Sequence, residues 1–264
     1  MTRIGSRFEE LKAAGRTAFV GFITAGDPMP DATPGLALAL EAAGVDVLEL
    51  GIPFSDPMAD GPSIQAASQR ALGQGMSLTR VLDCVREIRR TSQMPIVLMS
   101  YYNPMLQRGL ERFASECVEA GVDGIIATDL SPEEADPWKQ AAQAHNLDTV
   151  FLVAPTTPPS RMRRVARLSS GFIYCVSRTG VTGARAELTS GLKELIERIR
   201  KETDLPIAVG FGISRPEHVQ AVGRWGDGVV VGSSLVDIIA SCAEEEPERL
   251  REALAARVRW LKGE

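Results

Sequence analysis

The chain has 264 residues, of which 44% are hydrophobic and 24% are charged, and its formal net charge is −5. This composition is typical of an ordinary globular protein, and the scattered basic residues argue against a nucleic-acid partner. No apolar run approaches the roughly 20 residues that a membrane-spanning helix needs, and the charged N-terminus does not resemble a secretory signal. We therefore expect a cytoplasmic protein with no membrane segment and four reduced cysteines, too widely spaced to form a metal-binding pair.

Short apolar runs alternate with helical segments along the chain. A capping-box spacing from Ser6 to Glu9 predicts a first helix that runs toward Ala14. The apolar runs that follow are nearly continuous, as parallel strands buried on both faces should be. The expected strands cover residues 18–23, 45–50, 95–100, 124–127, 149–153, 172–176, 207–209 and 228–231. Helices are expected between them, for example over residues 33–43, 64–72, 77–91 and 247–262, whereas residues 101–104 are expected to form a loop.

A short pattern recurs where a helix ends and a strand begins. Ala-Gly-Val-Asp occurs at residues 43–46 and again at 120–123, and Gly-Asp occurs at 226–227. Eight strand–helix units without a linker predict an α/β protein with a single (β/α)8 TIM barrel over residues 1–264 and an extra N-terminal helix. About 250 residues is a usual length for such a barrel. The alternative is a doubly wound open sheet, but its dinucleotide-binding glycine pattern is missing after the first strand.

The segment over residues 48–65 contains the most distinctive combination of residues in the chain. Glu49 lies within an apolar run, where a buried carboxylate is costly unless it is paired or used. The loop that follows is rich in proline and glycine and carries Asp56 and Asp60. A carboxylate at a strand end and another on the next loop could form an acid/base pair. The alternative is a salt-bridged glutamate followed by turn-forming aspartates.

Two glycine-containing loops follow the last two expected strands. Residues 210–214 and 232–234 contain no lysine or arginine, so any anion would be held mainly by backbone N–H groups and by a helix start after Ser233. A phosphate site is favoured because this is the usual phosphate position in such barrels, and two unliganded turns are the alternative. Residues 177–183, after the sixth strand, could form a mobile flap or a long surface connection.

These segments together resemble the tryptophan synthase alpha subunit family. The resemblance runs through residues 48–57, 59–62 and Gln65, and continues in residues 174–183 and 210–214. It implies retro-aldol cleavage of indole-3-glycerol phosphate to indole and glyceraldehyde 3-phosphate at the C-terminal ends of the barrel strands, with Glu49 and Asp60 as the catalytic pair. It also implies no metal or organic cofactor in this chain. A beta subunit that carries pyridoxal phosphate would receive the indole through a tunnel, within an α2β2 complex.

The resemblance further implies the residues around the catalytic pair. Substrate-binding residues would be Phe22, Tyr101, Tyr174, Thr182, Gly183, Phe211, Gly212, Gly232 and Ser233. Partner-contacting residues would be Pro53, Phe54 and Asp56. Residues 178–187 would form a lid that orders over the phosphate and brings Thr182 to Asp60. Two alternatives stay open, namely another phosphate-binding barrel lyase or isomerase and a non-catalytic activator of a partner enzyme. A Schiff-base aldolase is disfavoured because no expected strand contains a lysine.

Overall fold

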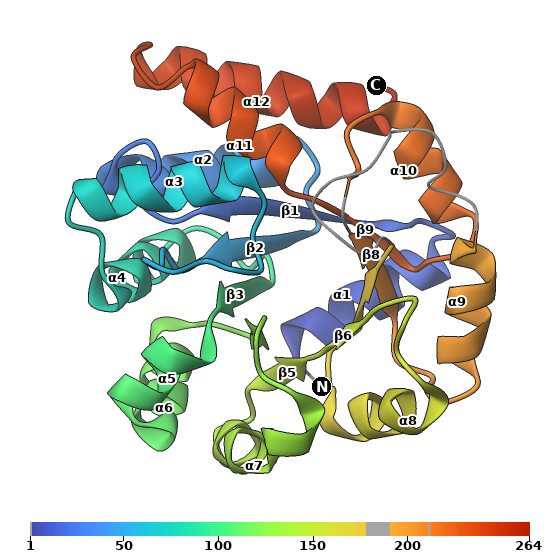
Figure 1. Ribbon diagram of the computed structural model, residues 1–264. Helices are drawn as coiled ribbons and strands as arrows, with labels where there is room; N and C mark the ends of the chain where they lie inside the picture. The colour runs from blue at the N-terminus through green and yellow to red at the C-terminus, as the bar shows by residue number, and fades with distance from the viewer. Residues whose placement is uncertain (1, 178–190, 211) are drawn as a thin grey trace.

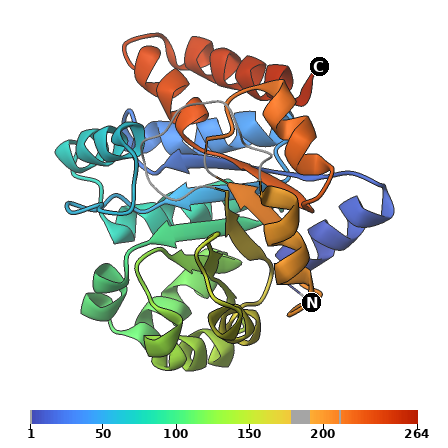
Figure 2. The same cartoon turned by 45° about the vertical axis from the view of Figure 1, so that its right-hand side comes forward.

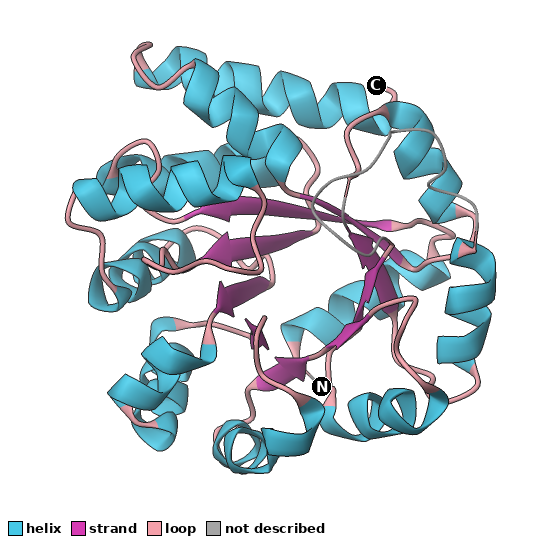
Figure 3. Ribbon diagram, viewed as in Figure 1, coloured by secondary structure: helices cyan, strands magenta, loops and turns pink. Residues whose placement is uncertain are grey.

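The computed structural model describes residues 2–177, 191–210 and 212–264. Its strands are all parallel and form a cylinder surrounded by helices (Figures 1 and 3). The predicted (β/α)8 barrel is therefore confirmed, together with the extra helix at the N-terminus. Within the described ranges, no helix has the length and apolar character needed to cross a membrane.

The strands are β1 (Ala18–Thr24), β2 (Val47–Gly51), β3 (Ile96–Ser100), β4 (Gly124–Ala127), β5 (Asp148–Val150), β6 (Leu152–Val153), β7 (Ile173–Val176), β8 (Ile207–Gly210) and β9 (Gly228–Val231). The α-helices are α1 (Arg3–Ala13), α2 (Thr33–Ala42), α3 (Pro62–Gly73), α4 (Leu78–Arg89), α5 (Tyr102–Arg108), α6 (Leu110–Ala120), α7 (Asp136–Ala144), α8 (Pro159–Leu168), α9 (Leu192–Arg200), α10 (Pro216–Gly223), α11 (Ser233–Ser241) and α12 (Pro247–Lys262). Short 3-10 turns cover Pro30–Ala32 and Pro132–Glu134.

The barrel closes through the fifth expected strand, which the structure divides into β5 and β6 on either side of Phe151. The strand order is β5-β4-β3-β2-β1-β9-β8-β7-β6. One half of this run pairs with β4 and the other half pairs with β7, so the two ends of the sheet are consecutive in the chain. The alternative of an open doubly wound sheet is therefore wrong.

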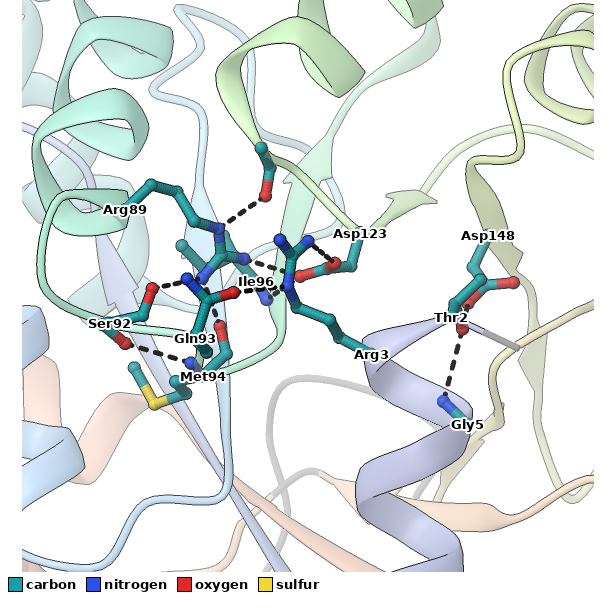
Figure 4. Close-up of polar contacts among 11 residues, drawn as sticks. Thr2, Arg3, Gly5, Arg89, Ser92, Gln93, Met94, Ile96, Asp123 and Asp148 are labelled. Carbon is teal, nitrogen blue, oxygen red and sulfur yellow. Dashed lines mark hydrogen bonds and ion pairs between the residues drawn. The ribbon is translucent and has the colours of Figure 1, made fainter.

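Two local predictions are wrong, and contacts between distant segments explain both. The first helix begins at Arg3 rather than near Ser6, because the Thr2 hydroxyl accepts the N–H of Gly5 at 3.3 Å while donating to Asp148 at 2.5 Å (Figure 4). Residues 102–104, expected to belong to a loop, are the start of α5, and Tyr101 is its N-cap. There the carboxylate of Asp129, which follows β4, accepts the N–H of Tyr102 at 2.7 Å and so satisfies a free donor of the first turn.

The apolar residues form an inner and an outer core. The outer core lies between the strands and the surrounding helices. The inner core fills the barrel with side chains from alternate strand positions, and α1 covers the end where the strands begin (Figure 2). Ile4, Phe8 and Leu11 of α1 belong to this inner core, and the Phe8 ring lies 5.6 Å from that of Phe172. The helix α1 thus covers the inner core at the end where the strands begin.

The recurring aspartate has a common structural role at the closed end of the barrel. Each Asp lies just before a strand and forms two hydrogen bonds with one residue at the start of the preceding strand. The Asp carboxylate accepts the backbone N–H of that residue, and the backbone N–H of the Asp donates to its carbonyl. Ser170 does the same with its hydroxyl. The pairs are Asp46 with Phe19, Asp123 with Ile96, Ser170 with Thr149, and Asp227 with Ile207. Arginines neutralise the carboxylates, as Arg3 and Arg89 do for Asp123 (Figure 4). The repeat seen in the sequence thus stabilises the end of the barrel opposite to the candidate site.

Candidate active site

The two predicted acids lie together where the strands end. Glu49 is on β2, beside Phe22 of β1 in the strand register, and its side chain is buried with 1% exposed. Asp60 lies just before α3 and is 9% exposed. Both carboxylates interact electrostatically with the Tyr174 hydroxyl of β7. The barrel therefore brings Glu49, Asp60 and Tyr174 to one place from separate parts of the chain.

The surroundings of Glu49 favour the protonated form of its carboxyl. Burial, and then the charge of Asp60, raise the pKa of the Glu49 carboxyl to about 8. Among the residues that the structure describes, Oε2 of Glu49 has no hydrogen-bond partner. Glu49 forms no ion pair with any residue that the structure describes, so the salt-bridged alternative does not explain its burial. At neutral pH this group is mainly protonated and can donate a proton.

Asp60 has a different environment because Tyr101 stabilises its charge. Burial raises the pKa of the Asp60 carboxyl to about 6, and a hydrogen bond from Tyr101 opposes this rise. The Tyr101 hydroxyl also accepts the N–H of Ala59 at 2.9 Å, and its ring stacks on Phe54 at 5.0 Å. The Gln65 side chain donates to the carbonyl of Asp60 at 2.8 Å. Asp60 is thus mainly ionised at neutral pH and fixed in position, with its pKa on the other side of neutrality from that of Glu49.

Aromatic side chains reach the mouth of the barrel because two strand ends are glycines. A Cβ at Gly51 would lie 2.8 Å from the ring of Phe22, and a Cβ at Gly210 would lie 2.4 Å from the hydroxyl of Tyr174. Any larger residue would displace these rings. Phe22 and Tyr174 are buried, with 2% and 8% exposed, so they can form the walls of a flat apolar pocket.

Part of this apolar wall was not predicted from the sequence. Phe22 packs in a small separate cluster with Ala67 and Val236, against which Ile64 and Met99 lie half-buried. These residues come from α3, α11 and β3. Ile64 could have been predicted from the sequence, because it lies inside the distinctive segment of residues 48–65. Met99 could not, because it looks like any other residue of an apolar strand.

The two glycine loops also lie where the strands end. Gly212 is exposed, has a φ of 78°, and has open space where a Cβ would be. Gly232 directly precedes α11, whose first residue Ser233 is exposed. The N–H groups at a helix start carry the positive end of the helix dipole. In α11 the N–H of Leu235 already donates to the carbonyl of Gly232 at 2.8 Å, so those of Ser233 and Ser234 are the N–H groups of the first turn that can meet an anion. This arrangement suits an anion.

Several predicted residues lie outside the described residues or differ in exposure. Thr182, Gly183, Phe211 and the expected lid over residues 178–187 are outside the described residues. Of the predicted partner contacts, Asp56 is exposed and Phe54 is partly exposed, whereas Pro53 is buried and can contact a partner only through its neighbours. Met58, which was not among the predicted contacts, is 92% exposed on the same loop.

Comparison with known proteins assigns this barrel to a family. The family model of the tryptophan synthase alpha chain matches residues 8–262. The alpha chain of Solibacter usitatus is 52% identical over 92% of this chain and 91% of its own length, and that of Roseiflexus castenholzii is 49% identical over the full length of both. The solved alpha subunit of Legionella pneumophila superposes with a TM-score of 0.89 at 40% identity, covering 99% of this chain and 98% of its own.

A structure of the Pyrococcus furiosus tryptophan synthase α2β2 complex contains a chain that is 41% identical, with a TM-score of 0.86 over 94% of this chain and 98% of that one. The likeness in sequence spans nearly the whole chain, and the likeness in structure includes the barrel and the added N-terminal helix. The chain belongs to the tryptophan synthase alpha chain family.

Proposed function

We propose that this chain cleaves indole-3-glycerol phosphate to indole and glyceraldehyde 3-phosphate, with Glu49 as the proton shuttle and Asp60 as the group that stabilises positive charge. The activity of the family is this carbon–carbon lyase reaction. The observation that carries the assignment of roles is the buried pair of carboxyls whose pKa values are about 8 and about 6. One acid is protonated and the other ionised at the same pH, as the reaction requires.

The first step needs a proton at indole C3. Protonated Glu49 donates it, and the ring becomes an indoleninium with positive charge at its nitrogen. The resulting carboxylate of Glu49 then takes the proton from the hydroxyl on the glycerol carbon that is bonded to C3. The carbon–carbon bond breaks, its electron pair returns to the ring, and the hydroxyl becomes the aldehyde of glyceraldehyde 3-phosphate. Glu49 ends in its starting protonation state, so one residue serves as acid and then as base.

Asp60 acts on the nitrogen side of the indole. An ionised Asp60 accepts the indole N–H and offsets the positive charge that develops after protonation at C3. The bond from Tyr101 favours the ionised form of Asp60, and the Tyr101 contact with Ala59 fixes the loop around it. Phe22 and Tyr174 would enclose the indole ring between these two acids.

The phosphate would bind at the two glycine loops. Gly212, Gly232 and Ser233 offer backbone N–H groups and a helix N-terminus at the end of the barrel where the acids lie. Gly183 and Phe211 remain predicted substrate contacts. A phosphate bound there would hold the glycerol chain in register with the acid pair.

The direct test is Glu49→Gln, which preserves shape and hydrogen bonding but cannot carry the proton. Indole release from indole-3-glycerol phosphate should fall by at least about 10²–10⁴-fold, and substrate binding should persist. Glu9→Gln, which removes an exposed carboxylate of α1, is the matched control and should leave turnover unchanged. Near-normal turnover of the Glu49→Gln variant would contradict the assignment. A wild-type chain without activity, alone or with a beta subunit, would favour the non-catalytic alternative.

We further propose that the chain acts in the cytoplasm with a beta subunit in an α2β2 complex. The family and the Pyrococcus furiosus complex support this partner. Pyridoxal phosphate would belong to the beta subunit, which would consume the indole to make L-tryptophan. The exposed part of the 53–60 loop, with Asp56, lies on the same loop as Asp60 and would couple the partner to the site. Measurement of indole formation with and without a beta subunit tests this proposal.

A further inference from the structure

A side chain of the C-terminal helix joins the two glycine loops. The helix α12 packs on the outside of the barrel against α2, α10 and α11 (Figure 1). From its third turn, Arg257 donates through Nε to the hydroxyl of Ser234 at 2.9 Å and through Nη2 to the carbonyl of Ser214 at 3.1 Å. Ser234 is in the first turn of α11 and Ser214 ends the loop after β8. One guanidinium therefore bridges both halves of the proposed phosphate site.

The two loops need such a bridge because strand pairing ends before them. The pairing of β8 with β9 includes Val209 with Val229 as its last pair. No β8–β9 pair is found beyond this one among the described residues, and Gly212 adds a conformationally permissive residue to the segment after β8. Ser214 is held from a second side as well, because its N–H donates to Nδ1 of His218 at 3.3 Å. Side-chain hydrogen bonds therefore add to the sheet in fixing the position of Ser214 relative to α11.

The bridge itself is built to hold one geometry. Ser234 is buried, with 6% exposed. The guanidinium of Arg257 lies 4.4 Å from the centre of the Trp260 ring, in a cation–π contact within the same helix. A guanidinium is a rigid fork with fixed donor directions, whereas a lysine would supply a single point of charge. The arginine can therefore fix the separation of the two loops.

We propose that Arg257 is a positioning residue of the phosphate site, which holds the loop that ends at Ser214 and the N-terminus of α11 so that their backbone N–H groups converge on one phosphate. This inference rests on the proposed function, because it assumes that the two loops bind the substrate phosphate. Arg257 contributes through Ser214 and Ser234, and it is distant in sequence from every residue of the acid pair. Its loss should weaken phosphate binding and leave the proton transfers largely intact.

The experiment compares Arg257→Ala, Arg257→Lys and Ser234→Ala with the wild-type chain. Binding of glycerol 3-phosphate is measured by calorimetry, and KM and kcat are measured with indole-3-glycerol phosphate. Arg257→Ala should raise the Kd and the KM about tenfold, which corresponds to about 1.4 kcal/mol, and should change kcat less than about twofold. Ser234→Ala should give a smaller loss, and the double variant should be no worse than Arg257→Ala alone because the two residues act through one contact.

The control is Arg249→Ala, which removes an arginine from the same helix whose side chain is 75% exposed and pairs only with Glu245 among the described residues. It should bind glycerol 3-phosphate as the wild type does. Full recovery in Arg257→Lys would overturn the proposal, since charge alone would then suffice. So would unchanged binding in Arg257→Ala, or a loss of kcat and thermal stability without a change in KM. If Arg257→Ala does not fold, unchanged binding in both Ser234→Ala and Arg257→Lys overturns it. A wild-type chain that does not bind glycerol 3-phosphate would instead refute the phosphate site itself.

Discussion

The raised pKa of Glu49 makes the stability of this protein depend on pH in a way that one substitution should remove. Burial and the charge of Asp60 shift the pKa of this carboxyl from 4.5 to about 8. Between these two values the folded chain binds more protons than the unfolded chain, so the free energy of unfolding falls as the pH rises. The full shift corresponds to about 5 kcal/mol at a pH above both values.

Glu49→Gln cannot titrate and should lack this part of the pH dependence. At about pH 5 the glutamate is protonated in the folded state but partly ionised in the unfolded state, which lowers the free energy of unfolding by about 1 kcal/mol. At about pH 9 the free energy of unfolding is lower by nearly the full 5 kcal/mol. The unfolding free energy of Glu49→Gln minus that of the wild type should therefore rise by about 4 kcal/mol between these two pH values. Any constant effect of the buried amide cancels in this change, and Asp60 titrates in both proteins.

The assay is urea unfolding, followed by circular dichroism, at several pH values for the wild type, Glu49→Gln and the exposed control Glu9→Gln. The control should follow the wild-type profile. If the difference between Glu49→Gln and the wild type stays constant within about 1 kcal/mol over this range, Glu49 is ionised at neutral pH. Burial would then not keep Glu49 protonated, and Glu49 could not be the proton donor at neutral pH.

Three further outcomes are expected. The plot of kcat/KM for indole-3-glycerol phosphate against pH should be bell-shaped, with limbs near the pKa values of about 6 and about 8. Tyr101→Phe should move the acid limb to higher pH, because the hydrogen bond that lowers the pKa of Asp60 is lost, and an unmoved limb would contradict this role of the hydroxyl. Gly210→Ala should cut activity and lower the melting temperature, because the new Cβ would lie 2.4 Å from the Tyr174 hydroxyl; wild-type behaviour in both would show that the ring can move freely. Asp56→Ala should reduce activation by a beta subunit more than the activity of the isolated chain, and an equal loss in both assays would assign Asp56 to folding rather than coupling.

The sequence alone predicted the class of fold, and the family resemblance singled out Glu49 and Asp60 as the candidate acid pair. Short apolar runs without alternation are typical of strands that are buried on both faces, so their repetition predicted parallel strands covered by helices. Glu49 stood out because a carboxylate in such a run requires a physical reason. The final helix was predicted with its bounds, Pro247–Lys262, because its apolar periodicity and its proline start are local features.

The tertiary structure decided whatever depends on contacts between distant residues. The true start of α1 depends on Asp148, which is 146 residues from Thr2, and the start of α5 depends on Asp129. The sequence could propose two acids but could not separate their protonation states. The two pKa values differ because Glu49 is completely buried and because the Tyr101 hydroxyl stabilises the charge of Asp60. Tyr101 follows Asp60 by 41 positions in the chain.

The contact of Arg257 with Ser214, across 43 residues, has the same origin. An arginine on an amphipathic helix looks like any other solvated residue until the packing of α12 places it between two loops. Burial, pKa and hydrogen-bond partners are properties of a site assembled from several strands and helices, so no local pattern in the sequence can encode them.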